Sequence, residues 1–214
     1  ETKRDALKRE MYEETGAIDL EYKPVSMNGE LGEYFDELKY FTNYTVVSST
    51  NSSSTGWVSW GDFQGCSELK SIGLDNITTI QAYGFENSGL ETVSAPVLTS
   101  IGEHAFERCT NLYQVGSLGK ITTLGSYAFS GCTALKKVVL PETLTQISQN
   151  AFDGCTELKE IVIPKNVSTL GEGAFNNSGV TTIYWNWTNS GAPTLPQTGT
   201  PAFGTNVQVI YMPK

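Results

Sequence analysis

The dipeptide Ala-Phe returns along this chain at nearly constant intervals, and this repetition limits the possible folds more than any other feature. It occurs at Ala105-Phe106, Ala128-Phe129, Ala151-Phe152, Ala174-Phe175 and Ala202-Phe203. Phe63 and Phe85 stand in the same phase, so successive phenylalanines are 21–28 residues apart. Repeats of this length are typical of solenoids, in which each unit packs only on its neighbours. Scattered apolar residues of an ordinary globular domain would not hold one phase for so long.

Each unit follows one internal pattern. Three positions after the phenylalanine comes a small residue: Cys66, Ser88, Cys109, Cys132, Cys155 or Ser178. An aliphatic residue follows, after which apolar and polar residues alternate, as at Val138 and Leu140 or at Ile161 and Ile163. Alternation with period two is typical of a short strand with one buried face. One unit cannot bury that face alone, so we expect the strands to stack at about 4.8 Å per unit into a continuous core.

The string AFSGCTALKKVVLPETLTQI, which begins at Ala128, resembles the BspA-type leucine-rich repeat of bacterial surface proteins. The resemblance covers about residues 58–185, with a weaker extension to the end, and residues 35–45 and 192–213 resemble the lead-in and the closing unit of such arrays. It implies an exported protein displayed on the cell surface and engaged in adhesion or protein binding, with no shared catalytic residues. Two positions depart from the pattern, Ser117, where a large apolar residue is expected, and Gly84. The predicted fold class is α/β and β-rich: a right-handed leucine-rich-repeat solenoid with an N-terminal helical cap.

Three regions are expected along the chain. Residues 1–34 form an N-terminal cap, with a helix from about 3 to 15 that begins at the capping box Thr2–Asp5 and a short strand near 18–22. Residues 35–185 form the repeat array, and residues 186–214 form an irregular closing repeat. The Ser/Thr/Asn-rich segment 45–56 is predicted to be a solvated loop within the first repeat.

Charge and hydropathy exclude two kinds of partner. The chain has 14 basic and 23 acidic residues, for a net charge of −9, which would repel nucleic acid and anionic lipid. No apolar run approaches the roughly 20 residues of a membrane helix, so we expect no membrane insertion by this segment. Because the sequence opens on Glu1 and not on a leader, any export signal is expected to lie outside it.

Candidate chemistry is sparse, and we expect no cofactor, no metal and no enzymatic activity. The four cysteines share one repeat position, so their side chains point the same way and are predicted to be free buried thiols. His104, the single histidine, occupies a variable outward position before Ala-Phe. A spatial pair of carboxylates would leave no motif, so a glycosidase pair stays open, although Glu157 and Glu160 are interpreted as solvated surface. The sortase-like string LPQTG at 195–199 is interpreted as a loop of the closing repeat.

The outward strand positions offer the best candidate binding site. In the second half of the array they are Lys137, Val139, Glu160, Val162, Thr182 and Tyr184. Val139, Val162 and Tyr184 align as an exposed apolar strip, which can mark a partner site, although strand propensity alone also explains them. Together with what the family resemblance implies, this strip predicts a non-enzymatic cell-surface or secreted module for binding or adhesion, which presents a concave strand face to a protein or glycan. The alternative is a passive spacer in a larger surface protein.

Overall fold

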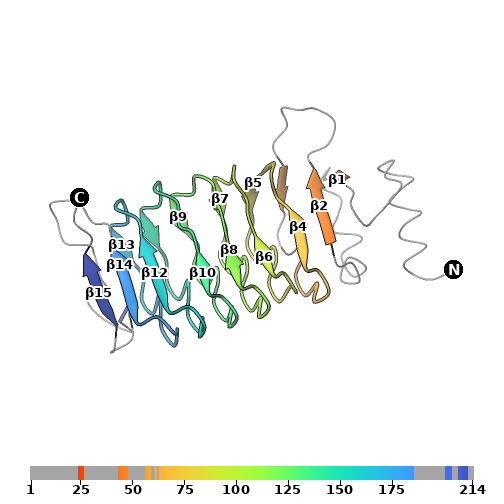
Figure 1. Cartoon of the computed structure of the whole chain (residues 1–214). Helices are drawn as coiled ribbons and strands as arrows, with labels where there is room; N and C mark the ends of the chain where they lie inside the picture. The colour runs from red at the N-terminus through yellow and green to blue at the C-terminus, as the bar shows by residue number, and fades with distance from the viewer. Residues whose placement is uncertain are drawn as a thin grey trace.

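In the computed structural model the chain winds into a β-solenoid (Figure 1). The structure describes residues 24–26, 43–47, 56–58, 61, 63–185, 201–203 and 207–211. Within these residues the repeats consist of short strands joined by turns, and no helix occurs there. The predicted N-terminal helix at 3–15, the strand near 18–22 and the LPQTG segment lie outside the described residues.

The first strand column contains one short strand from each repeat, and the strands pair in parallel within three sheets (Figure 1). Its strands are β1 (Pro24–Ser26), β2 (Asn43–Val47), β4 (Ser71–Gly73), β6 (Thr92–Val93), β8 (Gln114–Val115), β10 (Lys137–Val138), β12 (Glu160–Ile163), β14 (Thr182–Trp185) and β15 (Gln208–Tyr211). They form three three-stranded sheets, in the orders β1-β2-β4, β10-β8-β6 and β12-β14-β15. The column therefore has two interruptions, one of them between β10 and β12.

The second strand column lies on the other side of the coil (Figure 1). Its strands are β3 (Gly56–Val58), β5 (Ile77–Ile80), β7 (Ser100–Ile101), β9 (Thr123–Leu124), β11 (Gln146–Ile147) and β13 (Thr169–Leu170). They pair in parallel in the orders β3-β5-β7 and β13-β11-β9. Apolar side chains from both columns fill the space between them and form one continuous core.

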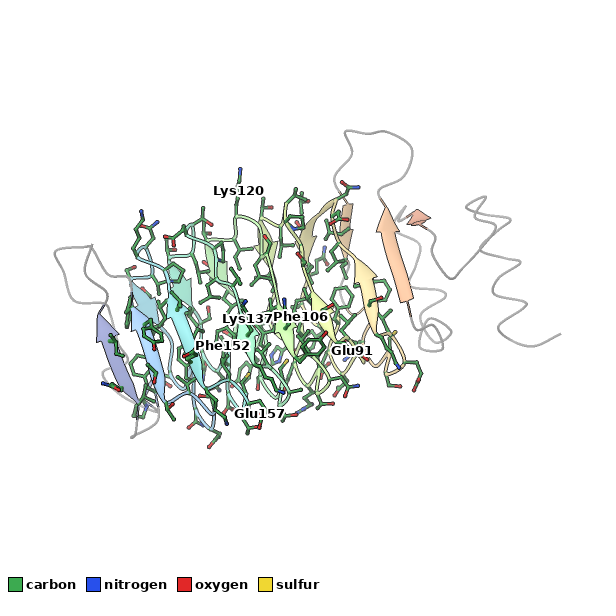
Figure 2. All side chains as sticks on the ribbon, in the orientation of Figure 1. Glu91, Phe106, Lys120, Lys137, Phe152 and Glu157 are labelled. Atoms are coloured by element: carbon green, nitrogen blue, oxygen red, sulfur yellow. The ribbon has the colours of Figure 1, made fainter. Side chains whose placement is uncertain are left out.

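The phenylalanines of the repeat register form a ladder along this core, with Phe106 and Phe152 labelled in Figure 2. Successive rings from Phe63 to Phe175 are nearly parallel, with centroids 5.0–5.6 Å apart. The final contact, from Phe175 to Phe203, is longer at 6.0 Å. Each ring from Phe63 to Phe175 is at most 1% exposed. The repeat register thus translates directly into a stack of buried aromatic rings, as a solenoid requires.

Both departures from the repeat pattern have a local explanation. Ser117 is exposed, and the following Leu118 takes a buried position instead. Gly84 is buried, and a Cβ there would lie 3.1 Å from side-chain carbons of Ile80 and Val58. The repeat therefore accommodates each departure without a change of fold.

Two repeats are one residue shorter than the others between the phenylalanine and the aliphatic residue. In these repeats Ser88-Gly89 and Ser178-Gly179 replace the Cys-Thr-x or Cys-Ser-x sequence. The shorter turn brings backbones into contact, because a Cβ on Gly89 would lie 1.9 Å from the carbonyl oxygen of Ser67. A Cβ on Gly179 would lie 2.0 Å from the carbonyl oxygen of Thr156. Glycine is needed at both positions because no side chain fits there.

The predicted loop at 45–56 is wrong at both of its ends. Thr45, Val46 and Val47 belong to β2 and pair with Pro24–Ser26 of β1. Gly56 begins β3. The reason is physical: Val46 and Val47 are β-branched and continue the strand that the Ser/Thr-rich composition obscured. Residues 48–55 lie outside the described part of the chain.

Candidate functional site

The six residues predicted to form a binding site all lie on the first strand column. Lys137 and Val139 belong to the β10 segment, Glu160 and Val162 to β12, and Thr182 and Tyr184 to β14. The parallel register places Glu160 beside Thr182 and Val162 beside Tyr184. Lys137, Val139, Glu160 and Val162 are exposed, whereas Thr182 and Tyr184 are half-buried.

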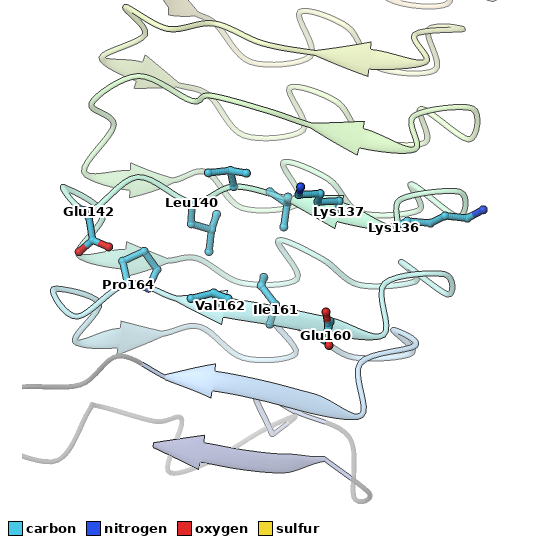
Figure 3. Close-up of a pocket in the computed structure, with 10 residues that line it drawn as sticks. Lys136, Lys137, Leu140, Glu142, Glu160, Ile161, Val162 and Pro164 are labelled. Atoms are coloured by element: carbon cyan, nitrogen blue, oxygen red, sulfur yellow. The ribbon is translucent and has the colours of Figure 1, made fainter. Parts of the chain in front are cut away.

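A groove lies between β10 and β12, and we call it the β10–β12 groove (Figure 3). Its volume is about 550 Å³, and it is lined by Lys136, Lys137, Val138, Val139, Leu140, Glu142, Glu160, Ile161, Val162 and Pro164. Four of the six predicted residues line it, while Thr182 and Tyr184 lie on the next strand. Of the predicted apolar strip, Val139 and Val162 therefore line the groove, whereas Tyr184 lies outside it on β14.

The interruption of the strand column gives rise to the groove. β10 pairs with β8 and β12 pairs with β14, but no strand pairing joins β10 to β12. At this step the inward residue Val138 is only partly buried, whereas the corresponding Val115 and Ile161 are 0% and 2% exposed. The groove therefore reaches apolar side chains that the other repeats cover.

The walls of the groove are unusually apolar for an exposed strand face. Val139 is 48% exposed and Val162 is 51% exposed. In the first half of the array the positions corresponding to Val139 are Gly73, Ser94 and Gly116. Large apolar groups are thus presented to solvent beside the groove, where a partner could bury them.

Charged side chains stand at both ends of the groove. Lys136, Lys137 and Glu160 lie toward the beginning of the two strands, and Glu142 lies at the opposite end with Pro164 (Figure 3). Among the described residues, none of these four charged side chains forms an ion pair within 4.0 Å. Their charges are therefore available to a ligand.

Six lining residues were not predicted from the sequence. Lys136 and Glu142 are exposed, whereas Pro164 is buried. Pro164 follows the alternating strand pattern that ends at Ile163, and Lys136 precedes the outward positions that begin at Lys137. Ile161, Leu140 and Val138 were assigned to the core by their alternation. Nothing in the residue pattern distinguishes Val138 from the buried Val115, so the opening of the groove leaves no sequence signal.

A second cluster of polar and aromatic side chains surrounds the single histidine. The His104 ring stacks between Tyr83 and Tyr127, at centroid distances of 4.6 and 4.8 Å, and its Nδ1 lies 2.5 Å from Glu107 Oε2. Arg108 bridges Glu107 and the buried Glu86, at 3.5 Å in each case. The polar groups of this cluster bind one another, which indicates a role in stacking the repeats. His104 lies at the surface as expected, but it is half-buried between its neighbours.

The cysteines stand in one buried column. All four are 0% exposed, and Cys109, Cys132 and Cys155 are free thiols, as predicted. Each of these three thiols donates to the carbonyl oxygen of a phenylalanine in the preceding repeat, at 3.0–3.1 Å. The column therefore fills the core and ties successive repeats together.

The described part of the chain holds neither a metal-binding cluster nor a membrane-spanning helix. There, no three histidine, cysteine or acidic side chains gather into a group that could hold a metal ion. In the same residues no helix has the length and apolar character needed to span a bilayer.

The sequence matches the family described as "BspA type Leucine rich repeat region", in six copies over residues 37–97 and 78–191. Because these matches cover more than half of the chain, the protein belongs to the BspA-type leucine-rich-repeat family. None of the curated proteins compared with the sequence matches it.

Two solved structures are similar to this fold. A leucine-rich repeat protein from Bacteroides ovatus is 31% identical, with a TM-score of 0.57 over 63% of this chain and 36% of that protein. A leucine-rich repeat protein from Eubacterium ventriosum is 25% identical, with a TM-score of 0.52 over 71% of this chain and 46% of that protein. The chain therefore spans less than half of either protein.

Proposed function

We propose that this chain is a non-enzymatic binding module, and that the strand face around the β10–β12 groove takes up a protein ligand. The observation that carries the proposal is the pair Val139 and Val162, about half exposed on the two walls of the groove. Leucine-rich-repeat proteins are generally interaction or structural modules, and the family supports this class. A role in adhesion at the cell surface, after export, is part of the proposal.

The proposal predicts that binding depends on the two valines. The purified chain would be applied to arrays of extracellular matrix proteins and of glycans, beside the double variant Val139→Ser/Val162→Ser. Covering two half-exposed valines contributes on the order of 1 kcal/mol each, so the double variant should bind its array protein roughly tenfold or more weakly.

Val97→Ser is the matched control, because Val97 is similarly exposed at 44% and does not line the groove. It should bind like the unchanged chain. Equal loss in the control would refute a site at the groove, and signals on the glycan array alone would show the wrong ligand class. No signal on either array would favour the passive spacer.

A further inference from the structure

The β10–β12 groove combines an apolar floor with a definite arrangement of charge. The floor consists of Val138, Leu140 and Ile161, and no aromatic ring lines the groove. A sugar would have to leave hydroxyl groups unsatisfied against such aliphatic side chains, which costs free energy. An apolar side chain placed between Val139 and Val162 would gain by burial.

The shape of the groove favours an extended chain as its occupant. It follows the direction of the strands from Lys136 to Glu142, a span of up to about 20 Å for a fully extended chain. An extended peptide of about six residues has the same length and places alternate side chains on one face. The groove therefore fits a peptide strand lying alongside β10 and β12.

The charged residues around the groove indicate in which orientation a peptide would bind. Residues 136–165 contain four lysines and four acidic residues, so the net charge of −9 belongs entirely to the rest of the chain. The repulsion that an acidic group meets from the chain as a whole is therefore weakest here. Such a group can approach Lys136 and Lys137, which lack an ion-pair partner among the described residues and which, with Glu160 at the same end, leave that end of the groove with a net positive charge. Glu142 is the acidic lining residue at the opposite end of the groove, near Pro164, where it would attract a basic group or a hydroxyl donor.

From these observations we infer that the β10–β12 groove binds an extended peptide segment that carries an acidic residue, then an apolar residue, then a basic residue. The acidic side chain meets Lys136 and Lys137, the apolar side chain lies between Val139 and Val162, and the basic side chain meets Glu142. This inference rests on the proposed function and names the chemistry of the partner.

The test is a selection of random heptapeptides, displayed on phage, against the purified full chain. Enrichment of peptides in which an acidic residue precedes an apolar and then a basic residue would support the inference. The best of them would be synthesised and measured by fluorescence anisotropy at low and high salt. In the variant Lys136→Glu/Lys137→Glu its affinity should fall about tenfold, because two ion pairs become repulsive.

Lys120→Glu is the charge control, because Lys120 is exposed in another repeat and does not line the groove. It should leave the affinity nearly unchanged, and circular dichroism melting would show that each variant is folded. Enriched peptides that keep their affinity in the Lys136 and Lys137 variant would overturn the inference, as would enrichment of another charge order or of no peptide at all. If valine-dependent binding to array proteins persisted beside such a failure, the proposed function would stand and only its peptide form would be wrong.

Discussion

At the scale of the residue, the cysteine column shows how burial changes chemistry without a functional site. Burial raises the pKa of the Cys109 and Cys155 thiols from 9.0 to about 12, because the thiolate would lose its hydration. Burial likewise raises the pKa of Cys132 well above 9.0, and the neighbouring thiols add to the effect. The same repeat position holds serine at Ser88 and Ser178, so a small polar side chain is the common requirement.

These raised pKa values predict that stability falls in alkaline solution. Below a pH of about 9 the thiols are protonated in both the folded and the unfolded chain, so the free energy of unfolding is at its full value with respect to these groups. As pH rises toward 12 the unfolded chain loses protons that the folded chain retains, which lowers the free energy of unfolding by up to about 1.4 kcal/mol per thiol and pH unit. Urea unfolding at pH 8 and at pH 9.5 measures this loss. The variant Cys109→Ser/Cys132→Ser/Cys155→Ser should lose less over the same interval, and an equal loss in both proteins would contradict the explanation.

At the scale of the element, the two short turns depend on close backbone contact. Gly179 donates its N–H to the carbonyl oxygen of Cys155 at 3.0 Å, and Gly89 donates to Cys66 at 2.9 Å. A methyl group at Gly179 would clash with the Thr156 carbonyl oxygen. This atom belongs to the backbone, so it cannot move away by a side-chain rotation. The free energy of unfolding of the Gly179→Ala variant should therefore be lower than that of the unchanged chain by about 1–3 kcal/mol or more.

The control for this prediction is Gly116→Ala on the exposed strand face. A Cβ at Gly116 would meet its nearest atom at 3.5 Å, which is ordinary van der Waals contact. Its free energy of unfolding should stay within about 0.5 kcal/mol of the unchanged chain. Equal urea midpoints for the Gly116 and Gly179 variants would show that the short turn has room to relax.

The elements also show which features could be predicted from the sequence. Alternating burial, as at Ile161 and Ile163, follows from a period of two residues, so the first strand column was predictable. The separation of β10 from β12 was not, because it depends on backbone spacing between repeats and Val138 has the same apolar character as Val115. The outward positions of Lys137 and Val139 were therefore expected, but the groove between them and β12 was not.

At the scale of the whole molecule, the protein behaves as a one-dimensional stack. Each repeat contacts the repeats before and after it, so stability is a sum of units and interfaces between neighbours. Phe129 illustrates this, since its ring is 5.2 Å from Phe106 and 5.6 Å from Phe152. Loss of this one ring removes two interfaces near the middle of the array.

In such a stack, a destabilising substitution in a central repeat is expected to make the repeats on its two sides unfold separately. The Phe129→Ala variant should lose about 3–5 kcal/mol, because a buried cavity replaces the ring. Its repeats on either side should then unfold in separate steps, seen as two transitions in urea.

The control is Phe203→Ala, which should cost less and leave one transition, since Phe203 is half-buried and its ring stacks on Phe175 at the longer distance of 6.0 Å. Hydrogen exchange would locate the change: in the Phe129 variant, amides of residues 106–152 should exchange faster than those of the distant repeats. A uniform acceleration along the whole array would instead show that the coil unfolds as a single cooperative unit.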